Sequence, residues 1–170
     1  MKKLVKQKLD NLLKKYNWDS IDKANWHWIS CHQKLSEDFI REFQDKIHWS
    51  SISWHQELSE NFIGEFKDKV YWCWISMFQE LSEDFIREFQ DKVYWHNISK
   101  CQKLSENFIG EFQDKVVWHM ICWYQELSFK FISEFRNKLN LNTLLNRNLI
   151  TQEDINEIYR PVSRFELMEI

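Results

Sequence analysis

Cysteine and histidine are the residue types in this chain with the greatest chemical potential, and some share a helical spacing. His27 and Cys31 are four residues apart, so a helix would place both on one face. Cys73, His96 and His119 follow one another at intervals of 23 residues. A zinc site needs about four ligands converging at roughly 2.0–2.3 Å, yet the chain has no Cys-x-x-Cys or His-x-x-x-His pair. The spacing therefore predicts no metal site.

Carboxylates are the second candidates, because paired acids can act in acid–base catalysis. They recur from one repeating unit to the next, which indicates a structural role, as Glu42, Glu65, Glu88 and Glu111 show. No glycine-rich phosphate loop and no nucleophile elbow is present. We therefore expect no catalytic residues, no cofactor and no enzymatic activity.

Large apolar side chains offer a third kind of chemistry, recognition of a partner, because aromatic residues dominate the binding energy of many interfaces. The chain has 10 Trp, 13 Phe and 5 Tyr among its 170 residues. The predicted binding residues lie where repeating units differ from one another: Trp28, Trp54, Tyr71, Trp74, Met77, Phe78, Tyr94, Met120, Trp123 and Tyr124.

These candidates are positioned by a tandem repeat of 23 residues. The period is visible in the columns that hardly change: Trp26, Trp49, Trp72, Trp95, Trp118; Ile29, Ile52, Ile75, Ile98, Ile121; and Gln33, Gln56, Gln79, Gln102, Gln125. A fixed period of this size is typical of a solenoid. Trp49, Ile52, Ser53 and Gln56 follow helical spacing, so the unit is helical.

Cap chemistry divides each unit into two short helices, expected at residues 46–56 (helix A) and 60–66 (helix B). Ser36, Ser59, Ser82, Ser105 and Ser128 are the predicted N-caps of helix B, and Asp45, Asp68, Asp91 and Asp114 those of helix A. The repeated Gln near the end of helix A is expected to satisfy backbone groups of the loop. The predicted fold is an all-α solenoid of about five two-helix repeats.

The ends of the chain differ from the repeats. Residues 1–21 are predicted to form a basic, amphipathic capping helix with Leu4, Leu9, Leu12 and Leu13 on its apolar side. The tandem repeats occupy 22–138, and a degenerate capping repeat occupies 139–160, with Thr151 at the Ser position. Pro161 should end the last helix, which leaves residues 161–170 as a tail.

Helix A is the part of the unit that varies. One column reads Trp28, Ser51, Trp74, Asn97, Met120, and the next reads Cys31, Trp54, Met77, Lys100, Trp123. A constant scaffold beside a varied, aromatic face is how repeat proteins bind partners. The alternative is that this face is core, since Ile47, Val70, Val93 and Val116 lie on the varied side. The sequence leaves both open.

Charge and composition restrict the partner. Residues 1–16 contain six Lys and one Asp, whereas the rest of the chain carries 17 basic and 25 acidic residues. This acidic balance makes nucleic acid an unlikely partner, although a nucleic-acid-binding repeat protein or a self-assembling structural protein are the alternatives to a protein-binding scaffold. No apolar run reaches the ~18 residues of a membrane span. Unevenly spaced thiols favour a reducing compartment, so we expect a cytoplasmic protein.

The repeat unit resembles a known type. The segments LSEDFIREFQDKVYWHNIS and LSENFIGEFQDKVVWHMIC are similar to the short tandem repeats of uncharacterised proteins from giant DNA viruses and some phages, and the resemblance covers about residues 22–138. It implies a virus-encoded protein acting in the host-cell cytoplasm. It implies no known activity.

Overall fold

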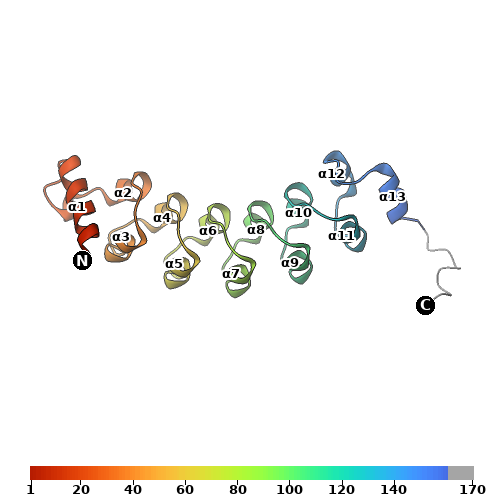
Figure 1. Ribbon diagram of the computed structural model, residues 1–170, viewed down its shortest axis with the longest axis horizontal. Helices are drawn as coiled ribbons and strands as arrows, with labels where there is room; N and C mark the ends of the chain where they lie inside the picture. The colour runs from red at the N-terminus through yellow and green to blue at the C-terminus, as the bar shows by residue number, and fades with distance from the viewer. Residues whose placement is uncertain (161–170) are drawn as a thin grey trace. The chain divides into compact units, whose positions relative to one another are not determined.

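The computed structural model describes residues 1–160, and throughout that range the regular elements are helices (Figure 1). The fold is the expected all-α solenoid built from helix pairs. Helices A are α2 (Trp26–His32), α4 (Trp49–His55), α6 (Trp72–Phe78), α8 (Trp95–Cys101) and α10 (Trp118–Tyr124). Helices B are α3 (Glu37–Glu42), α5 (Glu60–Glu65), α7 (Glu83–Glu88), α9 (Glu106–Glu111) and α11 (Phe129–Glu134).

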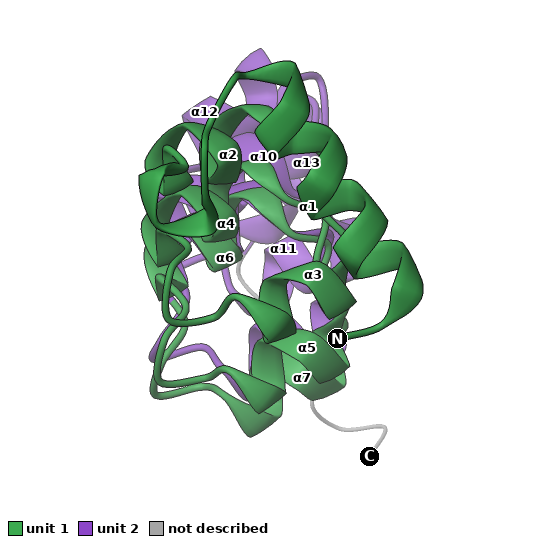
Figure 2. Ribbon diagram, turned by 90° about the vertical axis from the view of Figure 1, so that its left-hand side faces the viewer, with its two compact units in different colours: residues 1–93 green, residues 94–170 purple. Residues whose placement is uncertain are grey.

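The chain divides into two compact units, residues 1–93 and residues from 94 onward, which are coloured separately in Figure 2. In unit 1, α2 packs beside α4 and α4 beside α6, while α3, α5 and α7 form a second layer (Figures 1 and 2). In unit 2, α10 packs between α8 and α12 (Leu141–Asn146). Each unit thus has a layer of helices A and a layer of helices B.

Short helices of six or seven residues are marginal alone, so caps and burial must hold them. Each predicted serine accepts a hydrogen bond at the start of its helix B, as Ser59 does from the Phe62 N–H at 3.2 Å. The serine caps are therefore confirmed: Ser36, Ser59, Ser82, Ser105 and Ser128.

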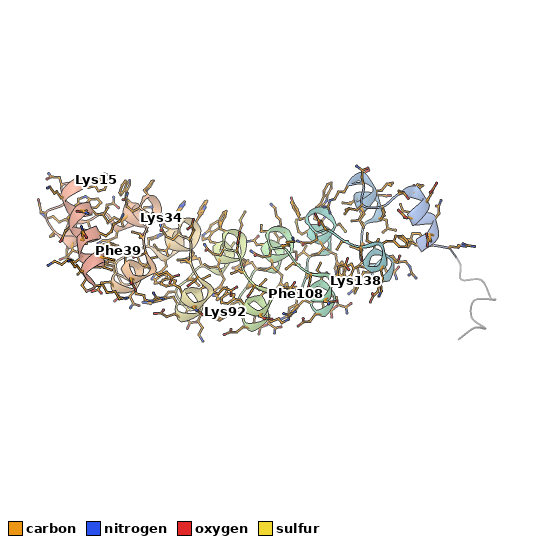
Figure 3. All side chains as sticks on the ribbon, viewed as in Figure 1. Lys15, Lys34, Phe39, Lys92, Phe108 and Lys138 are labelled. Atoms are coloured by element: carbon orange, nitrogen blue, oxygen red, sulfur yellow. The ribbon has the colours of Figure 1, made fainter. Side chains whose placement is uncertain are left out.

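The aspartate caps of helix A are wrong. The chain makes a turn through residues 43–46, so α4 begins only at Trp49 and its N-cap residue is His48. Asp45, Asp68 and Asp114 instead pair with lysines of the following repeat. Asp45 lies 3.4 Å from the Lys69 ammonium and Asp68 lies 3.0 Å from that of Lys92, which is labelled in Figure 3. The hydrogen bond from Lys92 lowers the pKa of Asp68.

The core of each unit lies between its layers. Phe39 and Phe108, labelled in Figure 3, are buried, as are the isoleucines of the constant helix A column. The constant tryptophans cover the edge of this core. Trp49 packs against Phe66 with the rings tilted and their centroids 4.9 Å apart, and its indole N–H donates to the Gln44 carbonyl at 3.0 Å. Its polar edge is thereby satisfied.

Two polar columns join neighbouring repeats, and this confirms the structural role predicted for the glutamines. Buried Gln56 donates to the carbonyls of Gln33 (2.8 Å) and Ser30 (3.1 Å) and accepts from the Leu35 N–H (2.9 Å). The Ser30 hydroxyl accepts from the His48 N–H at 3.0 Å, one repeat further along. The backbone between helices A and B is therefore hydrogen-bonded to the next repeat.

We expect Gln56→Ala to lower the free energy of unfolding by about 1–3 kcal/mol, because the Leu35 N–H and two carbonyls lose their partner in a buried place. Gln33→Ala is the matched control, since Gln33 is only half-buried and donates to the Tyr16 hydroxyl and the His32 carbonyl at 3.4 and 3.2 Å. Its cost should stay near 0.5 kcal/mol. Urea denaturation followed by circular dichroism measures both, and equal losses would contradict the role given to Gln56.

Helices also form outside the five repeats, at both ends of the described chain. In α1 (Lys3–Lys15) Val5, Leu9 and Leu12 are buried, whereas Leu4 is exposed, so its placement on the apolar side is wrong. A short 3-10 turn, η1 (Ile21–Lys23), leads into α2. Thr151 caps α13 (Gln152–Ile158) in a capping box with Asp154. The predicted tail and Pro161 lie outside the described residues. None of the described helices has the length and apolar character needed to cross a bilayer.

Candidate functional site

Three large aromatic side chains form an exposed stack on the helix A layer of unit 1. Trp54 comes from α4, and Trp74 and Phe78 come from α6. Ring centroids are 4.6 Å apart for Trp54 and Trp74, 5.7 Å for Trp54 and Phe78, and 6.0 Å for Trp74 and Phe78. We call these three residues the aromatic stack. Trp54 is 46% exposed and Phe78 is 44% exposed, although each contacts the rings of the other two members of the stack.

The packing of neighbouring helices A explains why these side chains meet. The column of Trp54 faces the following helix, and there it meets the column of Trp74. One repeat earlier the same two columns supply Cys31 and Ser51, whose Sγ and Oγ atoms are 3.1 Å apart. At these two places the facing residues match in size, small beside small and large beside large. Part of the variation is packing, because Ser51 is buried, and part is surface.

Trp28 belongs to a second cluster at the start of the chain. Its ring centroid lies 4.5 Å from that of Tyr16 and 6.3 Å from that of Trp18, and His32 stacks on it at 5.2 Å. Tyr16 and Trp18 were not among the sequence candidates. They precede the repeats, so no comparison of columns could single them out. Because Trp28 is half-buried, part of this cluster is packing between the end of α1 and α2, and part is exposed surface.

Tyr71 of unit 1 and Tyr94 of unit 2 are exposed, and Tyr71 is not part of the stack. They are the N-cap residues of α6 and α8, at the other end of helix A from Phe78 and its equivalents. Met77 is half-buried on α6, next to Phe78 in the chain. Of the candidates in unit 1, the structure thus brings only Trp54, Trp74 and Phe78 into one exposed cluster.

Unit 2 carries its remaining candidates on α10. Trp123 and Tyr124 are exposed there, whereas Met120 is half-buried. The ammonium of Lys100, from α8, lies 5.5 Å from the centroid of the Tyr124 ring. Lys100 thereby places a positive charge beside the exposed aromatic surface of unit 2.

The cysteine and histidine residues do not converge on a metal-sized cavity. The Cys31 sulfur lies 3.8 Å from the His27 Nε2, and the rings of His27 and His48 meet edge-on at 4.7 Å. Over residues 1–160, no three side chains of metal-ligating type come together. Cys122 replaces the constant serine and accepts from the Asn140 N–H at 3.3 Å, and burial raises the pKa of its thiol.

Among known proteins, a scan against family models and searches of curated proteins and of solved structures find no match to this chain. Function must therefore be argued from the repeat architecture and from the aromatic stack.

Proposed function

We propose that the protein is a non-enzymatic scaffold that binds a protein or peptide segment, with the aromatic stack as its main contact surface. One observation carries this proposal. Trp54 and Phe78 are packed as core residues are, in near-parallel ring contact, yet nearly half of each side chain is left to water. Exposed apolar clusters of this kind are characteristic of interaction sites.

The rigidity of the stack favours binding. Each ring is held by its neighbours, and α4 is tied to both adjacent repeats, to the preceding one by Gln56 and to the following one by Ser53. A partner that covers the stack would therefore restrict few additional side-chain rotations, which keeps the entropic cost of binding low. Tryptophan is also the residue most enriched among those that dominate binding energy.

The surroundings of the stack indicate a partner rich in apolar side chains. His55 stacks on Trp54 at a ring distance of 5.2 Å and extends the flat surface. The loop that follows α4 carries the exposed carboxylate of Glu57, which pairs with the ammonium of Lys34 at 3.4 Å. Because the chain beyond residue 16 carries 17 basic and 25 acidic residues, a peptide suits this surface better than a phosphate backbone does.

A displayed library of random peptides, selected against the full chain, tests the proposal. We expect the enriched peptides to share aromatic or large aliphatic residues. Their affinity should not depend on salt concentration between roughly 50 and 500 mM, a range over which the Debye length falls about threefold. Selection should fail to enrich the same peptides on a Trp54→Ser/Phe78→Ser variant. Enrichment of those peptides on the variant would contradict the proposal, and steeply salt-dependent binding of oligonucleotides to the wild-type chain would favour a nucleic acid partner instead.

A further inference from the structure

Two kinds of helix B alternate along the chain, EDFIRE and ENFIGE, and they differ at two positions. The second of these, occupied by arginine or glycine, changes the contact with the next helix B. In α3 this position is Arg41, whose side chain reaches the next helix B, α5. The Arg41 Nε donates to the Glu65 carboxylate at 2.8 Å, and the guanidinium carbon lies 4.8 Å from the centroid of the Phe62 ring. The hydrogen bond to Glu65 raises the pKa of Arg41. The chain therefore fills this place with its own guanidinium.

In α5 the same position is Gly64, and the place that a side chain would fill is open. The equivalents of Phe62 and Glu65 are Phe85 and Glu88, on α7. Between α5 and α7 lies a hollow of about 310 Å³, which we call the Gly64 hollow; it is lined by Glu60, Asn61, Gly64, Ser82, Asp84, Phe85, Glu88 and Phe89. A Cβ added at Gly64 would lie 3.7 Å from the Phe89 ring, an ordinary contact, so the glycine is not required by close packing.

The exposed fraction of the phenylalanine in the hollow reflects the absence of an arginine side chain over it. Phe62, under Arg41, is 0% exposed, whereas Phe85, beside Gly64, is 7% exposed. Unit 2 repeats the pattern at Gly110, where Phe131 is 5% exposed. Glu88 has no hydrogen-bond or ion-pair partner within the described part of the chain, in contrast to Glu65. Phe85 and Glu88 thus have no cation beside them within the described residues, whereas Phe62 and Glu65 contact the guanidinium of Arg41.

We propose that the Gly64 hollow binds an arginine side chain of a partner protein or peptide, in the manner in which the chain binds its own Arg41. The guanidinium would lie over Phe85 and pair with Glu88. A planar guanidinium suits a ring face and a carboxylate together better than the compact ammonium of lysine. This site is on the helix B layer, and the proposal does not depend on the aromatic stack.

The other charges that face the hollow are acidic or already engaged. Glu60 accepts a hydrogen bond from the Ser82 N–H, and Asp84 pairs with Arg87 at 2.8 Å. The comparable hollow at Gly110, of about 340 Å³, has Lys130 at the position of Asp84. Its positive charge should weaken the binding of a cation there. The hollow at Gly110 therefore serves as a comparison site with a lower expected affinity for arginine.

The probe for this site is N-acetyl-arginine amide, titrated into the full chain while the ring resonances of labelled phenylalanine are followed by NMR. We expect saturable shifts at Phe85 and smaller shifts at Phe131. The citrulline analogue has nearly the same shape but no charge, and it should leave Phe85 unchanged. Equal shifts with citrulline would overturn the proposal, since they would show binding without a guanidinium.

Variants of the protein locate the site. Glu88→Gln should lower the affinity for the arginine probe about two- to fivefold, the range expected for the loss of one exposed ion pair. Glu80→Gln is the matched control, because it removes the same charge from a loop residue outside the hollow, and it should bind as the wild type does. If the two variants weaken binding equally, the effect is one of overall charge and the site is wrong.

Filling the hollow from within gives an independent test. Gly64→Arg recreates the Arg41 arrangement at α5 and should abolish the shifts at Phe85, whereas Gly64→Ala should keep them within about twofold, because a methyl group leaves most of the hollow open. Undiminished binding by Gly64→Arg would overturn the proposal. Should that variant fail to fold, the comparison of Glu88→Gln with Glu80→Gln decides the question.

Discussion

Replacing Trp72 with alanine should lower the free energy of unfolding by about 3–5 kcal/mol, the usual cost of removing a large buried aromatic side chain. Trp72 is 9% exposed, and its ring lies 5.1 Å from that of Phe89 and 6.3 Å from that of Phe85. Its indole N–H also donates to the Lys67 carbonyl at 2.8 Å. The loss would therefore open a cavity between the layers of unit 1 and leave a carbonyl without its partner.

Trp74→Ala is the matched control for this prediction, because it makes the same change two residues later on the same helix. Trp74 is half-buried, and its ring stacks with those of Trp54 and Phe78. Two aromatic contacts at about 0.5–1.5 kcal/mol each set its expected cost at roughly 1–3 kcal/mol. Guanidinium denaturation followed by far-ultraviolet circular dichroism compares the two. A larger loss for Trp74 would mean that the core and the surface of helix A have been exchanged.

The fold was predictable because the repeats provide an alignment within one chain. Columns that do not vary, such as the constant isoleucines and Gln56, proved to be core residues or links between repeats. The serine caps follow from local chemistry, since a hydroxyl three residues before a helical N–H can satisfy it without any tertiary contact. Information of this kind is present in any single unit.

The errors arose where local and tertiary chemistry compete. Asp45 precedes helix A at a spacing that suits an N-cap. Because the chain turns at residues 43–46, however, α4 begins only at Trp49, and the Asp45 carboxylate pairs with Lys69 of the next repeat. Leu4 fits a helical stripe by spacing, yet the face of α1 that is covered runs through Val5, Leu9 and Leu12. Which face a neighbour covers is decided by the fold, and a pattern in one helix does not contain it.

The candidate sites show the same division. Variation in helix A pointed to Trp54, Trp74 and Phe78, but only the structure showed that two varied columns face each other across neighbouring helices. The exchange of Arg41 for Gly64 was visible as an alternation in the sequence. Its consequence, a filled place on one helix pair and an open one on the next, depends on contacts between repeats.

The Trp54→Ser/Phe78→Ser variant should lose at least about two orders of magnitude in affinity for a peptide selected on the wild-type protein, since each aromatic anchor contributes roughly 2 kcal/mol or more when a partner covers it. Both side chains are nearly half exposed, so the variant should keep its helical circular dichroism and lose only about 1–3 kcal/mol of stability. Isothermal titration calorimetry measures the affinity, and thermal denaturation measures the stability.

The control for this experiment is Tyr71→Ser, which removes an aromatic side chain of comparable exposure, 52%, from the N-cap of α6. Tyr71 lies outside the aromatic stack, so its loss should change the affinity by less than about threefold, within the range of near-neutral interface positions. Tyr71→Ser could instead lower the peptide affinity as much as the double variant does. That result would show that binding depends on exposed aromatic surface in general and not on the packed stack. If the double variant unfolds, Trp54 and Phe78 act as core residues, and variation in helix A reflects packing between neighbouring repeats.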